Sequence, residues 1–178
     1  MRKLVESTFV TLDGDIGAPQ VWGPPYWDDE HAAYAAKLLS AADALLLGRA
    51  TYEGFVEAWP SREGEIADRI NGLPKHVASR TLEESTWNAT LIEGDLAEAV
   101  AALKEQPGED LLKYGTGELD RTLIPAGLVD ELHLWIFPVL VGGGRPLIEG
   151  IDTTHLKLVE TTPFESGIVV NVYAPKSS

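Results

Sequence analysis

Short apolar runs alternate with helical patterns along most of this chain, and that alternation limits the available folds more than any other feature. Strands that alternate with helices favour a sheet whose faces are covered by helices. We therefore predict an α/β fold with three layers, in which a mostly parallel sheet lies between helices. The predicted strands span residues 4–10, 44–47, 76–79, 89–92, 111–114, 131–141, 155–162 and 168–174.

The predicted helices stop where the C-terminal third begins. They span residues 29–40, 64–71, 95–104 and 118–126. In the clearest of them, Asp95 is suited to cap the N-terminus of an alanine-rich body that Pro107-Gly108 stops. Beyond Glu131 the strands are joined by Gly- and Pro-rich turns, so we expect antiparallel strands at that end of the sheet.

Length, charge and cysteine content narrow the class of protein. A chain of 178 residues suits a single domain, which we place at residues 1–178. The formal net charge of −14 is spread along the chain, so we expect neither nucleic acid nor a membrane as a partner. The chain has no cysteine, and we see no secretory leader or membrane-spanning run, which together favour a cytoplasmic protein.

Two predicted strand ends carry groups that bind anions. The motif Gly48-Arg49-Ala50-Thr51 turns from a strand into a helix start, where free N–H groups and side chains would hold a phosphate. The motif Ser79-Arg80-Thr81 offers two hydroxyls and a guanidinium. A solvated arginine after a glycine turn explains the first motif equally well, and Thr81 also fits a helix capping box with Glu84.

A third strand end passes through the glycine turn Gly115-Thr116-Gly117-Glu118-Leu119 into a predicted helix. The two glycines let a backbone approach a pyrophosphate closely, and the helix would add N–H groups. Asp120 stands where the dinucleotide-binding fingerprint has its third glycine, and the chain has no GxxxxGK[ST] loop. Neither a Rossmann nor a P-loop fold is supported.

Three carboxylates are candidates for acid chemistry or for a polar anchor. Asp29 and Glu30 follow the aromatic stretch 22–27, where an apolar setting would raise a carboxyl pKa, although helix N-terminal charge is the alternative role. Asp13, after the first strand, is the third candidate. The four histidines lack metal-ligand spacing, so we predict no metal site.

Taken in order, six motifs resemble those of the dihydrofolate reductase superfamily, especially the reductase domain of bifunctional riboflavin-biosynthesis proteins. They span nearly the whole chain. The six motifs are Thr11-Leu12-Asp13-Gly14, residues 42–52, Ser79-Arg80-Thr81, residues 115–119, residues 127–132 and residues 138–147.

This resemblance implies a dihydrofolate reductase-like fold with NADPH lying across the carboxyl ends of the strands. It implies cofactor phosphates near Gly48, Arg49 and Thr51, with Ser79 and Arg80, followed by Thr81, near the adenosine 2′-phosphate. The pyrophosphate would lie over Gly115, Thr116, Gly117, Glu118 and Leu119. The nicotinamide would border Leu12, Gly14, Ile16 and Gly17. Trp22 and Trp27, in the loop expected beside the nicotinamide, are our candidates for substrate contact.

The implied activity is NADPH-dependent reduction of a small heterocyclic or ribosyl-aminopyrimidine substrate, similar to that of 5-amino-6-(5-phosphoribosylamino)uracil reductases. A dihydrofolate reductase proper and a non-catalytic NADPH- or nucleotide-binding module are the alternatives. The resemblance also implies a homodimer. In the strand that contains residues 132–137, Trp135 and Phe137 face away from Leu134 and Ile136, so helices or a partner subunit must cover a second apolar surface.

Overall fold

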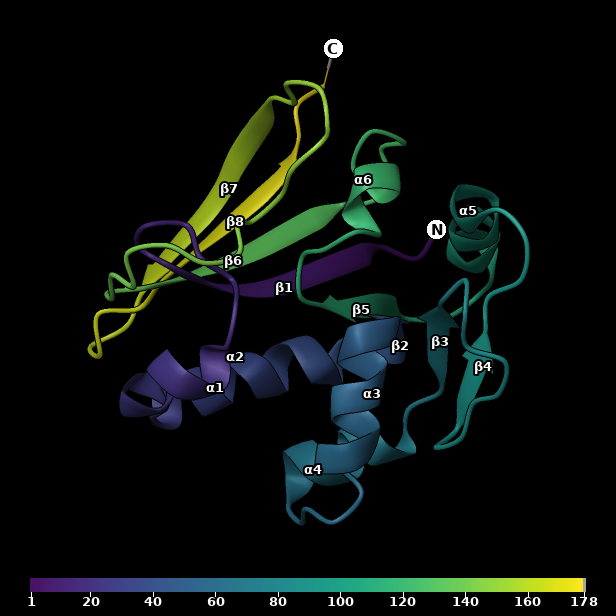
Figure 1. Cartoon of the computed structure of the whole chain (residues 1–178), viewed down its shortest axis with the longest axis horizontal. Helices are drawn as coiled ribbons and strands as arrows, with labels where there is room; N and C mark the ends of the chain where they lie inside the picture. Colours follow the sequence, from purple (N-terminus) through teal and green to yellow (C-terminus); the bar gives the residue numbers. More distant parts are fainter. Residues whose placement is uncertain (178) are drawn as a thin grey trace.

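The computed structural model describes residues 1–177, in which eight strands form one sheet of order β4-β3-β2-β5-β1-β6-β8-β7 (Figure 1). Strands β1 to β6 pair in parallel, whereas β8 pairs antiparallel with both β6 and β7. The predicted parallel sheet with antiparallel C-terminal strands is thus confirmed. The strands are β1 (Leu4–Thr11), β2 (Ala42–Gly48), β3 (Lys75–Ala78), β4 (Ala89–Leu91), β5 (Asp110–Tyr114), β6 (Glu131–Phe137), β7 (Leu156–Pro163) and β8 (Val169–Pro175).

Helices cover both faces of this sheet, which gives the three layers that the sequence predicts (Figure 1). The helices are α1 (Pro19–Trp22), a 3-10 turn (Pro24–Tyr26), α2 (Asp29–Ser40), α3 (Arg49–Ala58), α4 (Glu65–Gly72), α5 (Leu96–Glu105) and α6 (Asp120–Leu123). The alternation along β2 divides the core. Leu45 and Leu47 pack in the cluster that contains residues of α2, α3 and α4, whereas Leu46 packs with residues of α5 and α6.

The β6 strand ends at Phe137, four residues before the predicted end at residue 141. Pro138 follows, and a proline has no N–H to donate to the neighbouring strand. The chain turns there, with the Val139 N–H donating to the carbonyl of Phe137 at 2.8 Å. Within β6, Trp135 and Phe137 are buried while Leu134 and Ile136 are half-buried, as the alternation predicts.

Three of the four predicted helices form within one residue of their predicted bounds, among them α4, whose N-terminus has no side-chain cap. The α2 helix spans the predicted residues, and α5 begins directly after Asp95, whose carboxylate accepts the N–H of Glu98 at 3.0 Å. The helix predicted over residues 118–126 is largely wrong, because only α6 is helical and turns flank it. The capping box at Thr81 is also wrong, since residues 81–84 form no helix. Within residues 1–177, no helix combines the length and apolar character that a membrane crossing requires.

Candidate functional site

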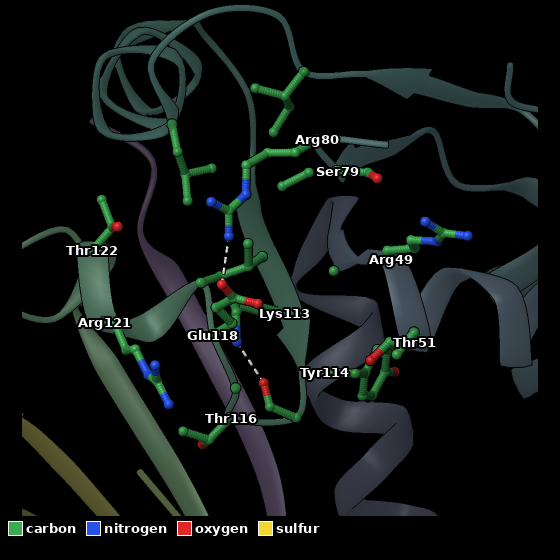
Figure 2. A pocket seen from close by; sticks show the side chains of 18 of the residues that line it. Arg49, Thr51, Ser79, Arg80, Lys113, Tyr114, Thr116, Glu118, Arg121 and Thr122 are labelled. Atoms are coloured by element: carbon green, nitrogen blue, oxygen red, sulfur yellow. Dashed lines mark hydrogen bonds and ion pairs between the residues drawn. The ribbon is translucent and has the colours of Figure 1, made fainter. Parts of the chain in front are cut away.

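A cleft of about 770 Å³ opens at the carboxyl ends of β2, β3 and β5 (Figure 2). Because these three strands are parallel neighbours in the sheet, the loops that follow them meet at one edge. All the residues predicted from the three anion-binding motifs line this cleft. They are Gly48, Arg49, Thr51, Ser79, Arg80, Thr81, Gly115, Thr116, Gly117, Glu118 and Leu119.

At the β2 end, the first backbone N–H groups of helix α3 face the cleft, and no side chain accepts them as a cap. Gly48 is the N-cap of α3, no side chain caps this end, and the first turn holds no acidic residue. Arg49 donates to the carboxylate of Glu53 at 2.9 Å and also to the hydroxyl of Thr81. Since α3 has ten residues, its first turn presents a partial positive charge together with these side chains.

At the β3 end, a turn holds the polar residues in place. The Ser79 hydroxyl oxygen accepts the N–H of Thr81 at 3.2 Å and that of Leu82 at 3.0 Å, so the chain turns sharply after the strand. Arg80 extends across the cleft and forms an ion pair with Glu118 at 2.5 Å, as Figure 2 shows. Both side chains are exposed, so an incoming anionic group can compete for this arginine.

At the β5 end, a buried charge cluster holds the glycine loop from beneath. The Lys113 ammonium contacts Asp120 at 2.8 Å and Glu6 at 3.4 Å. It also donates to the carbonyl of Gly115, and Figure 2 shows Lys113 at this place in the cleft. The Thr116 hydroxyl donates to Glu6 at 2.5 Å. The N–H of Gly117 donates to the Asp120 carboxylate at 2.7 Å. This N–H therefore has a protein acceptor already, and the four-residue α6 adds little dipole.

Burial determines the protonation of this cluster. Glu6 and Asp120 are fully buried, and each has one carboxyl oxygen with no hydrogen-bond partner among the described residues. Removal from water raises the pKa of Glu6 to about 8, with Lys113 opposing the rise and Asp120 adding to it. Glu6 therefore carries a proton at neutral pH, which reduces the negative charge buried beside Lys113.

The loop predicted to border the nicotinamide lies outside the cleft lining. Leu12, Gly14, Ile16 and Gly17 do not line the cleft, although Arg145, which does, is attached to the same loop. The N–H of Ile16 donates to the carbonyl of Arg145 at 2.9 Å. The predicted nicotinamide contacts thus form a separate group from the phosphate residues.

Two of the three acidic candidates hold loops in place. Asp13 accepts the Thr11 hydroxyl at 2.6 Å and the Gly142 N–H at 2.8 Å. These hydrogen bonds, that of Thr11 above all, lower the pKa of Asp13 and keep it ionised at neutral pH. Glu30 accepts the N–H of Glu165 at 2.7 Å and so links α2 to the turn between β7 and β8.

Asp29 lies in the first turn of α2 and has no hydrogen-bond partner within residues 1–177. The two tryptophans differ in exposure. Trp22 is buried, donates its indole N–H to the Gly17 carbonyl at 2.7 Å and packs on Phe137. These contacts give Trp22 a structural role. Trp27 is 46% exposed and lies beside His31.

Comparison with known proteins places the chain. Residues 2–170 match the RibD C-terminal domain family. The chain is also 34% identical to the protein YyaP of Bacillus subtilis (strain 168), over 97% of this chain and 94% of YyaP. The chain belongs to the RibD C-terminal domain family.

Solved structures at lower identity share the fold of this RibD C-terminal domain protein. A protein from Shewanella sp. PV-4 assigned to riboflavin biosynthesis has a TM-score of 0.75 at 22% identity, with 98% of this chain and 99% of that chain covered. Dihydrofolate reductase from Enterococcus faecalis, complexed with NADP(H), has a TM-score of 0.67 at 19% identity, with 98% and 97% covered. The predicted dihydrofolate reductase-like fold is confirmed.

In this RibD C-terminal domain protein, two further arginines line the cleft that our sequence analysis did not assign to it. Arg121 lies on α6, and Arg145 follows three successive glycines in the loop after β6. An arginine after a Gly-Gly-Gly run, on a chain of net charge −14, is a signal that sequence reasoning could have used. The buried cluster was also missed, although Glu6 and Lys113 stand out as charges within apolar strands that pair in register.

Proposed function

We propose that this protein is an NADPH-dependent reductase whose cofactor phosphates bind in the cleft at the carboxyl ends of β2, β3 and β5. The observation that carries the proposal is the set of positive groups in this one cleft. Arg49, Arg80, Arg121 and Arg145 line it together with the uncapped end of α3. Because a net charge of −14 repels anions at long range, cations gathered at one site favour a specific anionic ligand.

The proposal assigns each part of the dinucleotide to chain residues. Ser79, Arg80 and Thr81 receive the adenosine 2′-phosphate through hydroxyl and guanidinium donors. The α3 N-terminus, with Arg49 and Thr51, and the 115–119 loop border the pyrophosphate. The 12–17 loop borders the nicotinamide. When bound, NADPH supplies a hydride for a C=N or C=O carbon of a small heterocyclic or ribosyl-aminopyrimidine substrate.

The chain's own part in this chemistry is orientation and proton supply. Asp13 is ionised and engaged by backbone N–H groups, so it serves as an anchor for the loop and not as the acid. Among the three candidates, Asp29 is the one whose carboxyl is free of hydrogen bonds in the described chain, and we assign it the role of acid or polar anchor. Tyr114 also lines the cleft, where burial raises its pKa and keeps the phenol protonated.

Consumption of NADPH tests this function directly. Purified protein should oxidise NADPH in the presence of at least one member of a panel of pterins, aminopyrimidines and ribosylated aminopyrimidines, and Asp29→Asn should slow that reaction while NADPH binding persists. Binding of NADPH without turnover across the panel would instead favour a non-catalytic nucleotide-binding module. That alternative has some support, since Asp13 and Glu30 both hold loops.

We also propose a cytoplasmic homodimer. The half-buried residues Leu134 and Ile136 lie outside both hydrophobic clusters of the core. The edge strand β7 exposes Leu156, Leu158 and Val159. A second copy that covers this apolar surface would remove it from water. Sedimentation should give a dimer at micromolar concentration, and a monomer there would exclude the homodimer.

A further inference from the structure

The arginines that line the cleft differ in whether a carboxylate balances their charge. Arg49 contacts Glu53 at 2.9 Å, Arg80 contacts Glu118 at 2.5 Å, and Arg121 lies 3.9 Å from Glu149. Arg145 forms no ion pair with any residue of the described chain. It is therefore the one cleft arginine of residues 1–177 whose positive charge is left for a ligand.

The backbone of Arg145 is fixed by the loop that follows β1. Its N–H donates to the buried carboxylate of Asp15 at 2.6 Å, and its carbonyl accepts the N–H of Ile16 at 2.9 Å. Gly144 allows this approach. Its φ is +132°, and a Cβ there would lie 2.3 Å from the Asp15 carboxylate. A side chain at position 144 would push the loops apart, so the glycine fixes where Arg145 begins.

The Arg145 side chain reaches the glycine loop of the other half of the sheet. Its Nη2 lies 3.3 Å from the place that a Cβ on Gly117 would occupy. The absence of a side chain at Gly117 thus leaves room beside an unpaired guanidinium. Two donors of this loop are already engaged, because Asp120 accepts the Gly117 N–H and Glu6 accepts the Thr116 hydroxyl, so the Arg145 guanidinium adds a donor that these two groups do not supply.

We propose that Arg145 binds the pyrophosphate of the dinucleotide at the Gly115–Gly117 loop, and that Asp15 acts as its positioning residue. This inference rests on the proposed function and adds a donor from the β6–β7 connection to a site otherwise built from β2, β3 and β5. A guanidinium can bind two phosphate oxygens at once through parallel N–H donors. Because Asp15 and Ile16 hold the Arg145 backbone, the pyrophosphate site is connected to the loop assigned to the nicotinamide.

The test compares dissociation constants for NADPH, NADH and ADP in wild-type protein and in Arg145→Ala. Since all three ligands contain a pyrophosphate, the variant should weaken each of them by about tenfold to a hundredfold. The melting temperature should stay unchanged, because the Arg145 side chain has no ion pair to lose. Arg62→Ala is the matched control, because it removes the same charge at a residue that stacks on Trp59 outside the cleft lining, and its expected loss is below about threefold for every ligand.

Two further variants keep the result interpretable. Arg145→Gln retains most of the side-chain stem without the charge and should behave as Arg145→Ala does, even if the alanine variant folds poorly. Asp15→Ala removes the positioning contact and should weaken all three ligands in parallel, whereas Asp15→Asn keeps an acceptor for the Arg145 N–H and should restore most of the affinity.

Several results would overturn the inference. Unchanged affinities in both Arg145 variants would show that this side chain does not bind the ligand. A loss for NADPH alone would place Arg145 at the 2′-phosphate. If wild-type protein binds ADP through Arg145 but neither dinucleotide, the proposed cofactor is wrong while the pyrophosphate contact stands. If it binds none of the three, both proposals fail.

Discussion

The ends of β2 and β5 have the same local sequence pattern, a buried strand followed by a glycine and polar residues, yet they differ in what they leave free. At β2 the first turn of α3 has no side-chain cap. At β5 two donors of the loop are engaged within the protein, because Asp120 accepts the Gly117 N–H and Glu6 accepts the Thr116 hydroxyl. The β2 end therefore offers the first turn of a helix to a ligand, while the β5 end has two of its donors already in use. A glycine turn after a strand therefore does not by itself define an anion site.

The largest expected difference between the β2 and β5 ends is in how much a substitution at each lowers the free energy of unfolding. Lys113→Met leaves Glu6 and Asp120 buried without their cation, and such a loss costs about 3–5 kcal/mol of the free energy of unfolding. Arg49→Met at the β2 end breaks an exposed pair and should cost about 0–1 kcal/mol. Urea unfolding of both variants measures the difference. Equal losses would mean that the β5 cluster is no more important to the fold than a surface ion pair.

The pH dependence of stability gives the next largest effect. Burial raises the pKa of Glu6 from 4.5 to about 8 in the folded protein. Between these values the folded state binds a proton that the unfolded state has released. Glu6 therefore lowers stability as pH rises through this window, by up to about 1.4 kcal/mol per pH unit.

The variant Glu6→Gln cannot exchange this proton and should show a weaker fall, or a stronger rise, in unfolding free energy across the same window. Glu118→Gln, at an exposed acid of the 115–119 loop, is the control and should follow wild type. Parallel pH curves for Glu6→Gln and wild type would show that Glu6 is ionised in the folded protein.

A smaller effect concerns ligand binding at the open side of the cleft. Arg80→Ala removes a charge-assisted contact to the 2′-phosphate worth about 1.5–3 kcal/mol, so NADPH should bind about tenfold to a hundredfold more weakly. NADH lacks this phosphate and should hardly respond. Glu118→Gln frees Arg80 and should strengthen NADPH binding slightly. Equal losses for both dinucleotides in Arg80→Ala, with an unchanged melt, would place Arg80 on their shared part.

Much of this fold could be predicted from local patterns. The strands, the antiparallel end and the bounds of α2 follow from apolar periodicity and turn residues, and the start of α5 follows from the Asp95 cap. The short α6 and the early end of β6 could not be predicted in this way. The first depends on the burial of Asp120 beside Lys113, and the second on Pro138 ending the strand.

Part of the candidate site could also be predicted from local patterns. Three strand ends could be assigned to one cleft because parallel strands present their carboxyl ends together. The use of Gly117 by Asp120 and the approach of Arg145 to the glycine loop depend on contacts between segments far apart in sequence. Local spacing carries no information on such contacts, so the functional roles of Asp13 and Glu30 were likewise open until their hydrogen bonds were known.

Binding of NADPH in this cleft can be measured by calorimetric titration of the wild-type protein with NADPH and with NADH. We expect saturable NADPH binding with a Kd well below about 1 mM and weaker binding of NADH, since NADH lacks the group assigned to Ser79 and Arg80. No detectable heat or fluorescence change with about 1 mM NADPH, in a protein that melts cooperatively, would contradict it.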